Sequence, residues 1–86
     1  MTAYKFGDII YCDFPYSDNS GSKNRPALVL KTFDDNDILV CKITGKFYET
    51  EFDYVLKNYK QYNLPSFSII RTHKIITLKT NKIIKN

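Results

Sequence analysis

Three short segments contain residue types that suit work on a phosphate group. The first centres on Arg25, which follows a polar, turn-rich stretch and directly precedes an apolar run. We expect a flexible loop to deliver Arg25 to the start of a strand, where its guanidinium can grip a phosphate through two parallel hydrogen bonds. An ion pair with Asp8 or Asp13 is the alternative role for this arginine, and the local pattern alone favours it.

Thr44 and the segment Arg71-Thr72-His73 are the other two candidates. Thr44 ends a predicted strand, and alternation directs its hydroxyl away from the core. A threonine at a strand end is ordinarily only a β-forming or turn-forming residue. Arg71 and His73 share a face if one strand runs through both. Histidine is the side-chain type that exchanges protons near neutral pH, but a lone exposed histidine is usually only a surface residue.

The elements that must position these residues are strands. Apolar residues recur with a period of two, and β-branched and aromatic types dominate every apolar run. We predict strands at residues 7–14, 26–33, 38–44, 51–56, 66–72 and 74–78, with a tight connection over 34–37, a helical turn or irregular crossing over 57–64 and an ambiguous tail. This pattern predicts a mainly β fold, an SH3-like or OB-like small barrel of five to six short strands.

Length and composition exclude several classes of protein. The 86 residues make one domain, and 43% hydrophobic and 26% charged residues argue against disorder. No apolar run approaches membrane-spanning length, so we expect no membrane segment and no secretion. One histidine and two cysteines argue against a metal site or a disulfide scaffold, and we expect no cofactor. Cys12 and Cys41 are predicted to be buried, reduced thiols that face inward on neighbouring strands.

Charge is distributed unevenly along the chain. The first 56 residues contain all nine acids and six of the thirteen bases, whereas residues 57–86 contain seven bases and no acid. A basic C-terminal third on a small domain points to a phosphate-rich partner. The alternative is a lysine-rich face that is simply solvated, and composition alone favours it.

These pieces, in this order, resemble the MazF/PemK family of toxin ribonucleases from bacterial toxin–antitoxin systems. The family pattern has a Gly-Asp-Ile strand start, an Arg-Pro-Ala strand, a hydrophobic-Thr strand end, and a Leu-Pro-x-x-Ser segment that ends in arginine. The corresponding pieces of this chain are Gly7-Asp8-Ile9, Arg25 to Leu30, Ile43-Thr44 and Asn63 to Arg71. The similarity runs in register from about residue 5 to about residue 78.

The resemblance implies an SH3-like barrel that forms a homodimer, acts in the cytoplasm and is inhibited by a cognate antitoxin. It implies metal-independent, sequence-selective cleavage of single-stranded RNA, with Arg25 and Thr44 as the catalytic pair. The positions of Arg71 and His73 contribute to RNA binding or catalysis in some members. Lysines suit phosphates and tyrosines suit base stacking, so we also predict an RNA-binding set: Tyr16, Lys23, Lys46 and Lys74.

The chain departs from the family pattern at four points. His73 replaces an acid, Gly45 replaces a second Thr or Ser, and Lys79 replaces an Asp. The sequence stops near the point where a C-terminal helix would begin, so we expect that helix to be missing.

The chemistry that these residues suit can be stated independently of the family. When the 2′-hydroxyl of RNA attacks the adjacent phosphorus, charge builds on the non-bridging oxygens, and Arg25 and Thr44 can stabilise it. Proton donation by Arg25 is an additional role left open here, and His73 is a candidate for proton transfer if it lies near the site. A non-catalytic nucleic-acid-binding barrel is the second hypothesis; it predicts salt-sensitive binding without strand scission. A protein-interaction module is the third; it predicts no nucleic-acid binding at moderate salt.

Overall fold

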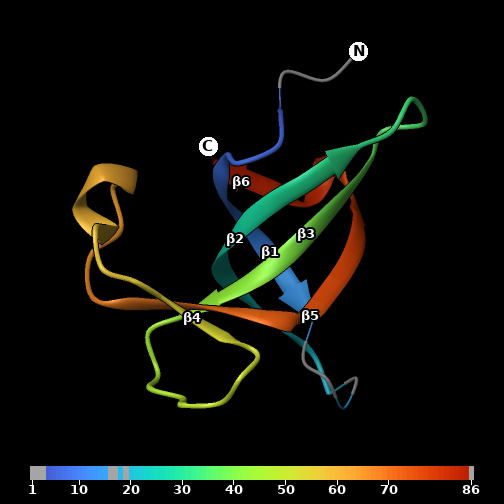
Figure 1. Ribbon diagram of the computed structural model, residues 1–86. Coiled ribbons are helices and arrows are strands. Elements are labelled where there is room, and N and C mark those ends of the chain that lie inside the picture. Colours follow the sequence, from blue (N-terminus) through green and yellow to red (C-terminus); the bar gives the residue numbers. More distant parts are fainter. Residues whose placement is uncertain (1–3, 16–17, 19, 86) are drawn as a thin grey trace.

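The computed structural model describes residues 4–15, 18 and 20–85, and these form one antiparallel sheet (Figure 1). Its strand order is β4-β5-β3-β2-β1-β6. The strands are β1 (Ile9–Pro15), β2 (Ser22–Thr32), β3 (Asp37–Thr44), β4 (Asp53–Leu56), β5 (Ser68–Lys79) and β6 (Ile83–Lys85), with two short 3-10 helices, η1 (Tyr59–Tyr62) and η2 (Thr80–Lys82).

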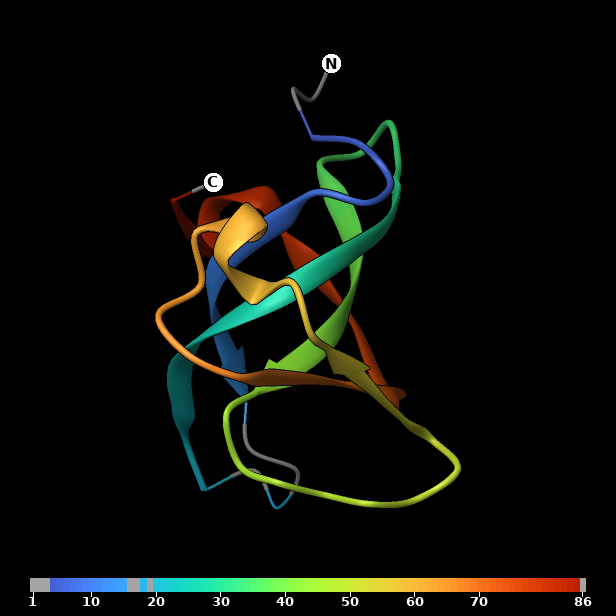
Figure 2. The same ribbon diagram turned by 60° about the vertical axis from the view of Figure 1, so that its left-hand side comes forward.

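The predicted mainly β class is confirmed, but the sheet is not closed into a barrel. No pairing within the described residues joins β4 to β6, so both are edge strands. The sheet instead curls around its own core, with β1 and β6 behind β2 and β3 (Figures 1 and 2). Neither helix in the described part of the chain is long and apolar enough to cross a membrane.

The sheet has an apolar cluster on each face. The inner cluster is enclosed by the curl, and its members include Ile10, Ala27 and Val40, all fully buried. The outer cluster contains Cys41 and Ile43, against which half-buried side chains pack from β1, β2 and η1. Because both faces of β3 are covered, its apolar residues run nearly without interruption instead of strictly alternating.

The turn before β1 explains the glycine of the Gly-Asp-Ile motif. Gly7 has a φ of 93°, a backbone conformation that disfavours any residue with a Cβ. In that conformation its N–H donates to the carbonyl of Val29 at 2.9 Å, and the N–H of Val29 donates to the carbonyl of Asp8 at 2.8 Å. These two hydrogen bonds therefore join the turn before β1 to β2.

The second strand begins earlier than the sequence predicted. β2 starts at Ser22, so Arg25 and Pro26 lie inside the strand and not at its first positions. The ladder to β3 begins only at Ala27, opposite Lys42, whereas the ladder to β1 already includes Pro26, opposite Tyr11. A proline is tolerated there because this part of β2 has a neighbour on one side only.

The strands predicted at 66–72 and 74–78 are a single strand, β5, and the boundary between them is a shift of register against β3. Along β3, Cys41 pairs with Ile75 and Ile43 pairs with Ile70, so four residues of β5 lie opposite Lys42 alone. An irregularity of this kind bends a strand sharply. Before this corner β5 pairs with β4 as well as with β3, and Arg71 lies opposite Asp53; after it β5 continues along β3.

The ambiguous tail forms η2 and then β6, which pairs with β1. Ile83 packs against the inner cluster, whereas its neighbour Ile84 is 54% exposed. This short strand therefore covers one side of the core.

We predict that Ile83→Ala lowers the free energy of unfolding by about 1–2 kcal/mol, because it removes partly buried apolar surface. Ile84→Ala, a neighbouring substitution of the same chemistry, should change it by less than about 0.5 kcal/mol. Urea denaturation followed by circular dichroism measures both. Equal losses would show that the inner core does not depend on β6.

Candidate functional site: a cation cluster on the inner face

Strand register brings the side chains of Arg25, Lys42 and Thr44 to one end of the inner face. Cys12 lies opposite Arg25, and Ala27 lies opposite Lys42; Cys12 and Ala27 are both buried in the inner cluster. Residues directly opposite each other in a ladder share a face, so Arg25 and Lys42 point to the inner side. Continuing the β2–β3 register by two residues would place Arg25 opposite Thr44.

Four other cations act electrostatically on Lys42. Burial is the first cause that lowers its pKa from the usual value, and four further cations lower it as well. Every charged group that shifts this pKa within the described part of the chain is a cation. We call the set the cation cluster: Arg25, Lys42, Lys46, Arg71 and Lys74.

Arg25 does not form the ion pair that the local pattern favoured. Within the described residues it has neither an ion pair nor a hydrogen bond, and Asp8 instead accepts from the backbone N–H of Lys5 at 3.1 Å. Its side chain is half-buried. The guanidinium therefore keeps its donors available for an anion.

Thr44 differs from the sequence expectation of a hydroxyl that points to solvent. The residue is only 6% exposed, and its Oγ1 accepts the backbone N–H of Lys46 at 3.2 Å. That contact fixes the position of the oxygen. Within the described residues the hydroxyl donates to no acceptor, so its proton remains available for a phosphoryl oxygen.

Arg71 is buried among three partners. Its Nε lies 3.2 Å from Oδ1 of Asp53, at an angle that makes an ion pair but no hydrogen bond. Its guanidinium carbon stacks 3.5 Å from the ring centroid of Tyr48, and its second Nη lies 3.4 Å from Nε2 of His73. The expected proximity of Arg71 and His73 is thus found, but most of the arginine is enclosed by protein.

The loop from 45 to 52 contacts the corner of β5 through two aromatic rings. Tyr48 lies between two members of the cation cluster, since Nζ of Lys46 is 5.4 Å from its ring centroid on one side and Arg71 stacks on it as well. The ring of Phe52 lies 5.4 Å from that of His73. Aromatic rings therefore link the loop to the corner of β5.

Five of the predicted site residues are brought together: Arg25 and Thr44 by register, and Lys46, Arg71 and Lys74 by their effect on Lys42. His73 joins them through Arg71. Lys23 is exposed, two residues before Arg25 on β2, and is not among the cations that act on Lys42. Tyr16 lies outside the described residues.

Sequence reasoning missed Lys42. The signal that could have found it is its spacing, because Lys42 precedes Thr44 by two residues and so shares its face of the strand. An isolated lysine in an apolar strand interior is also unusual.

The two cysteines are buried and free, as predicted, but they are not on neighbouring strands. β2 separates β1 from β3, with Cys12 in the inner cluster and Cys41 in the outer one. Burial raises the pKa of Cys12 to about 11 and also raises that of Cys41. Both thiols therefore stay protonated at neutral pH and are poor nucleophiles.

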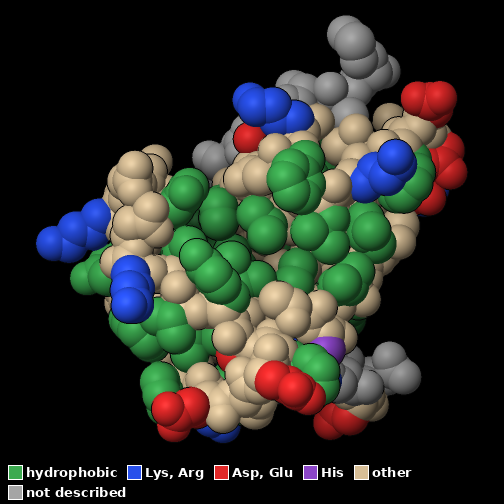
Figure 3. Space-filling view, viewed as in Figure 1, with side chains coloured by type: hydrophobic (Ala, Val, Ile, Leu, Met, Phe, Trp, Pro, Cys, Tyr) green, Lys and Arg blue, Asp and Glu red, His purple; other side chains and the backbone are tan. Residues whose placement is uncertain are grey.

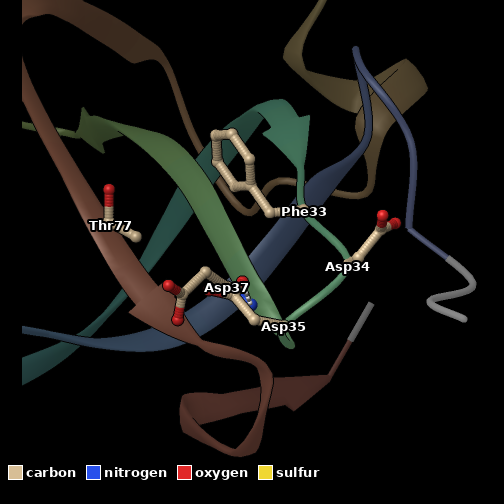
Figure 4. Close-up of a pocket in the computed structure, with 5 residues that line it drawn as sticks. All are labelled: Phe33, Asp34, Asp35, Asp37 and Thr77. Carbon is tan, nitrogen blue, oxygen red and sulfur yellow. Dashed lines mark hydrogen bonds between the residues drawn. The ribbon is translucent and has the colours of Figure 1, made fainter.

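A hollow of about 470 Å³ lies at the opposite end of the sheet, beside the turn between β2 and β3 (Figure 4). It is open to solvent, and its lining is acidic: Phe33, Asp34, Asp35, Asp37 and Thr77. Oδ1 of Asp37 is already paired with Nζ of Lys79 at 2.7 Å. The negative charge of this hollow would repel a phosphate. Among the described residues, no group of His, Cys, Asp or Glu is arranged to hold a metal ion.

We predict that Asp53→Asn lowers the free energy of unfolding by about 3 kcal/mol, because the buried guanidinium of Arg71 loses its counter-charge. Glu51→Gln is the matched control, since Glu51 is an exposed acid two residues before Asp53. Urea denaturation of both variants gives the comparison. A loss for Asp53→Asn no larger than that for Glu51→Gln would contradict a structural role for the pair.

Comparison with known proteins places the chain in a family. No curated protein matches it closely enough to be informative. A family model described as a PemK-like, MazF-like toxin of type II toxin–antitoxin systems matches residues 5–86. The chain therefore belongs to the PemK-like, MazF-like family of type II toxins, a membership that implies an antitoxin partner.

Proposed function

We propose that the protein is a metal-independent endoribonuclease that cleaves single-stranded RNA in the cytoplasm. The observation that carries this proposal is the cation cluster, in which Lys42 is surrounded by cations without an opposing acid among the groups that shift its pKa. Such a cluster is complementary to a phosphodiester backbone. Family membership supports the same activity.

The proposed reaction is attack of a 2′-hydroxyl on the adjacent phosphorus, which leaves a 2′,3′-cyclic phosphate and a 5′-hydroxyl. Arg25 binds the non-bridging oxygens, because its guanidinium has no ion-pair partner among the described residues and is permanently charged. The hydroxyl of Thr44 donates to the same oxygens from a position that the N–H of Lys46 fixes. Donors arranged in advance act on charge that develops in the transition state.

His73 is the proposed acceptor of the proton from the 2′-hydroxyl. Its side chain is exposed at the corner of β5, and its ring is held between Arg71 and Phe52. A guanidinium cannot accept a proton, so neither arginine of the site can serve as the base.

The decisive assay incubates a long single-stranded RNA with the protein in EDTA. We expect discrete fragments with 2′,3′-cyclic phosphate ends. Arg25→Ala should slow cleavage by about a hundred- to a thousandfold with an unchanged circular dichroism spectrum, because one charge-stabilising donor is lost. Lys31→Ala, a cation at the other end of β2, is the control that should cut at the wild-type rate.

Two results would contradict the proposal. Intact RNA that the protein nevertheless retains would favour a non-catalytic nucleic-acid-binding module. Cleavage by Arg25→Ala at the wild-type rate would remove Arg25 from the mechanism.

We also propose that two copies pair through the outer face. Figure 3 shows hydrophobic side chains gathered over β2 and β3 on that side of the molecule. Leu28 and Leu30 are half-buried there, and Ile75, opposite Cys41 in the ladder, is 45% exposed. So small a domain buries a limited share of its surface on folding, and covering this face with a second copy would add to it.

Light scattering at micromolar concentration should therefore give twice the chain mass of 10.1 kDa. Ile75→Lys should give the monomer mass, because a buried ammonium would face apolar surface. Ile84→Lys, at an exposed position on the edge strand β6, should leave the dimer intact. A monomer for the wild-type chain would overturn the proposed pairing.

A further inference from the structure

Lys42 lies in the cation cluster but has no role in the mechanism proposed above. It shares the inner face with Arg25 and Thr44, is half-buried, and lies where four residues of β5 bend away from β3. Within the described residues it has neither a hydrogen bond nor an ion pair. The donors of its ammonium are therefore unoccupied, on the face that Lys42 shares with Arg25 and Thr44.

The surroundings of Lys42 favour release of its proton. The charged groups that act on it are Arg25 from β2, Lys46 from the loop and Arg71 with Lys74 from β5, and all of these are cations. From β1 the inner face presents the thiol of Cys12, which is neutral because its own pKa is raised. Repulsion and burial both lower the pKa of Lys42, which makes the ammonium a stronger acid than an exposed lysine.

The leaving group of RNA cleavage needs such an acid. The 5′-oxygen departs as an alkoxide unless a proton reaches it, and the two arginines of the cluster do not give up a proton. Lys46 is exposed and lies over Tyr48, whereas Lys42 is on the face of Arg25 and Thr44.

We propose that Lys42 is a catalytic residue, the general acid that protonates the departing 5′-oxygen; this rests on the proposed ribonuclease function. The 2′-oxygen bonds to phosphorus as the bond from phosphorus to the 5′-oxygen breaks. The 2′-hydroxyl proton passes to His73, and a proton of the Lys42 ammonium passes to the 5′-oxygen. The products are the cyclic phosphate, the 5′-hydroxyl, a neutral amine and a protonated imidazole, and the last two reset by exchange with water.

The test uses two versions of one short RNA. In the first the leaving atom is the ordinary 5′-oxygen; in the second it is sulfur, which leaves as a thiolate without needing a proton. We expect Lys42→Ala to cleave the oxygen substrate about a hundred- to ten-thousandfold more slowly than wild type. The same variant should cleave the sulfur substrate at close to the wild-type rate. Arg25→Ala should be slow on both, because phosphoryl charge develops in both.

Lys42→Arg separates acid catalysis from charge. It keeps the positive charge and should fold, yet it should resemble Lys42→Ala on both substrates, because a guanidinium does not release its proton. Equal slowing of Lys42→Ala on both substrates, or wild-type cleavage of the oxygen substrate by Lys42→Arg, would overturn the assignment and leave the ribonuclease proposal intact. A wild-type protein that cuts neither substrate would overturn both.

Discussion

The ladders that join β3 to β2 and to β5 are the interaction on which the rest of this structure depends. Arg25, Lys42 and Arg71 come from three strands that are adjacent in the sheet, so backbone ladders hold their charges together. Repulsion among these cations is unfavourable, and burial of the apolar residues on both faces of β3 offsets it. Separating the charges would require breaking the central ladder, in which long-range hydrogen bonds join β2, β3 and β5.

Arg71 has a structural position within this group. Asp53 and Tyr48 enclose it, and the thiol of Cys41 donates to its backbone carbonyl at 3.1 Å. These contacts fasten the corner of β5 to β4 on one side and to β3 on the other. The buried arginine therefore acts on the site mainly through the position of this corner, to which His73 and Lys74 also belong.

Much of the fold could be predicted from the sequence, because local alternation reports burial directly. The faces of β1 and the end of β3 at Thr44 follow from a period of two, whereas the turn at Gly7, which the sequence pattern placed inside a strand, did not follow from it. The corner of β5 could not be predicted, since a shift of register depends on the neighbouring strand and leaves no local signal. The role of Lys42 could not be predicted for the same reason, because most of the cations that act on it are far away in the sequence.

The uneven distribution of charge along the chain does not predict where the positive site forms. The cation cluster takes Arg25, Lys42 and Lys46 from the part of the chain with net negative charge, and only two members from the basic C-terminal third. Lys79, from that third, is paired with Asp37 at the other end of the sheet. Folding, and not the order of charges along the chain, creates the positive site.

The lowered pKa of Lys42 also makes the free energy of unfolding depend on pH. Between that pKa and the usual value of 10.5 the unfolded chain binds a proton more readily than the folded one, so the free energy of unfolding rises with pH across this interval. Below this interval the ammonium is charged in both states. Any polyanion that binds the cation cluster reduces the repulsion among its members and favours the folded state by mass action. RNA would then be a folding ligand of the protein as well as its substrate, and melting temperatures would depend on the anions of the buffer.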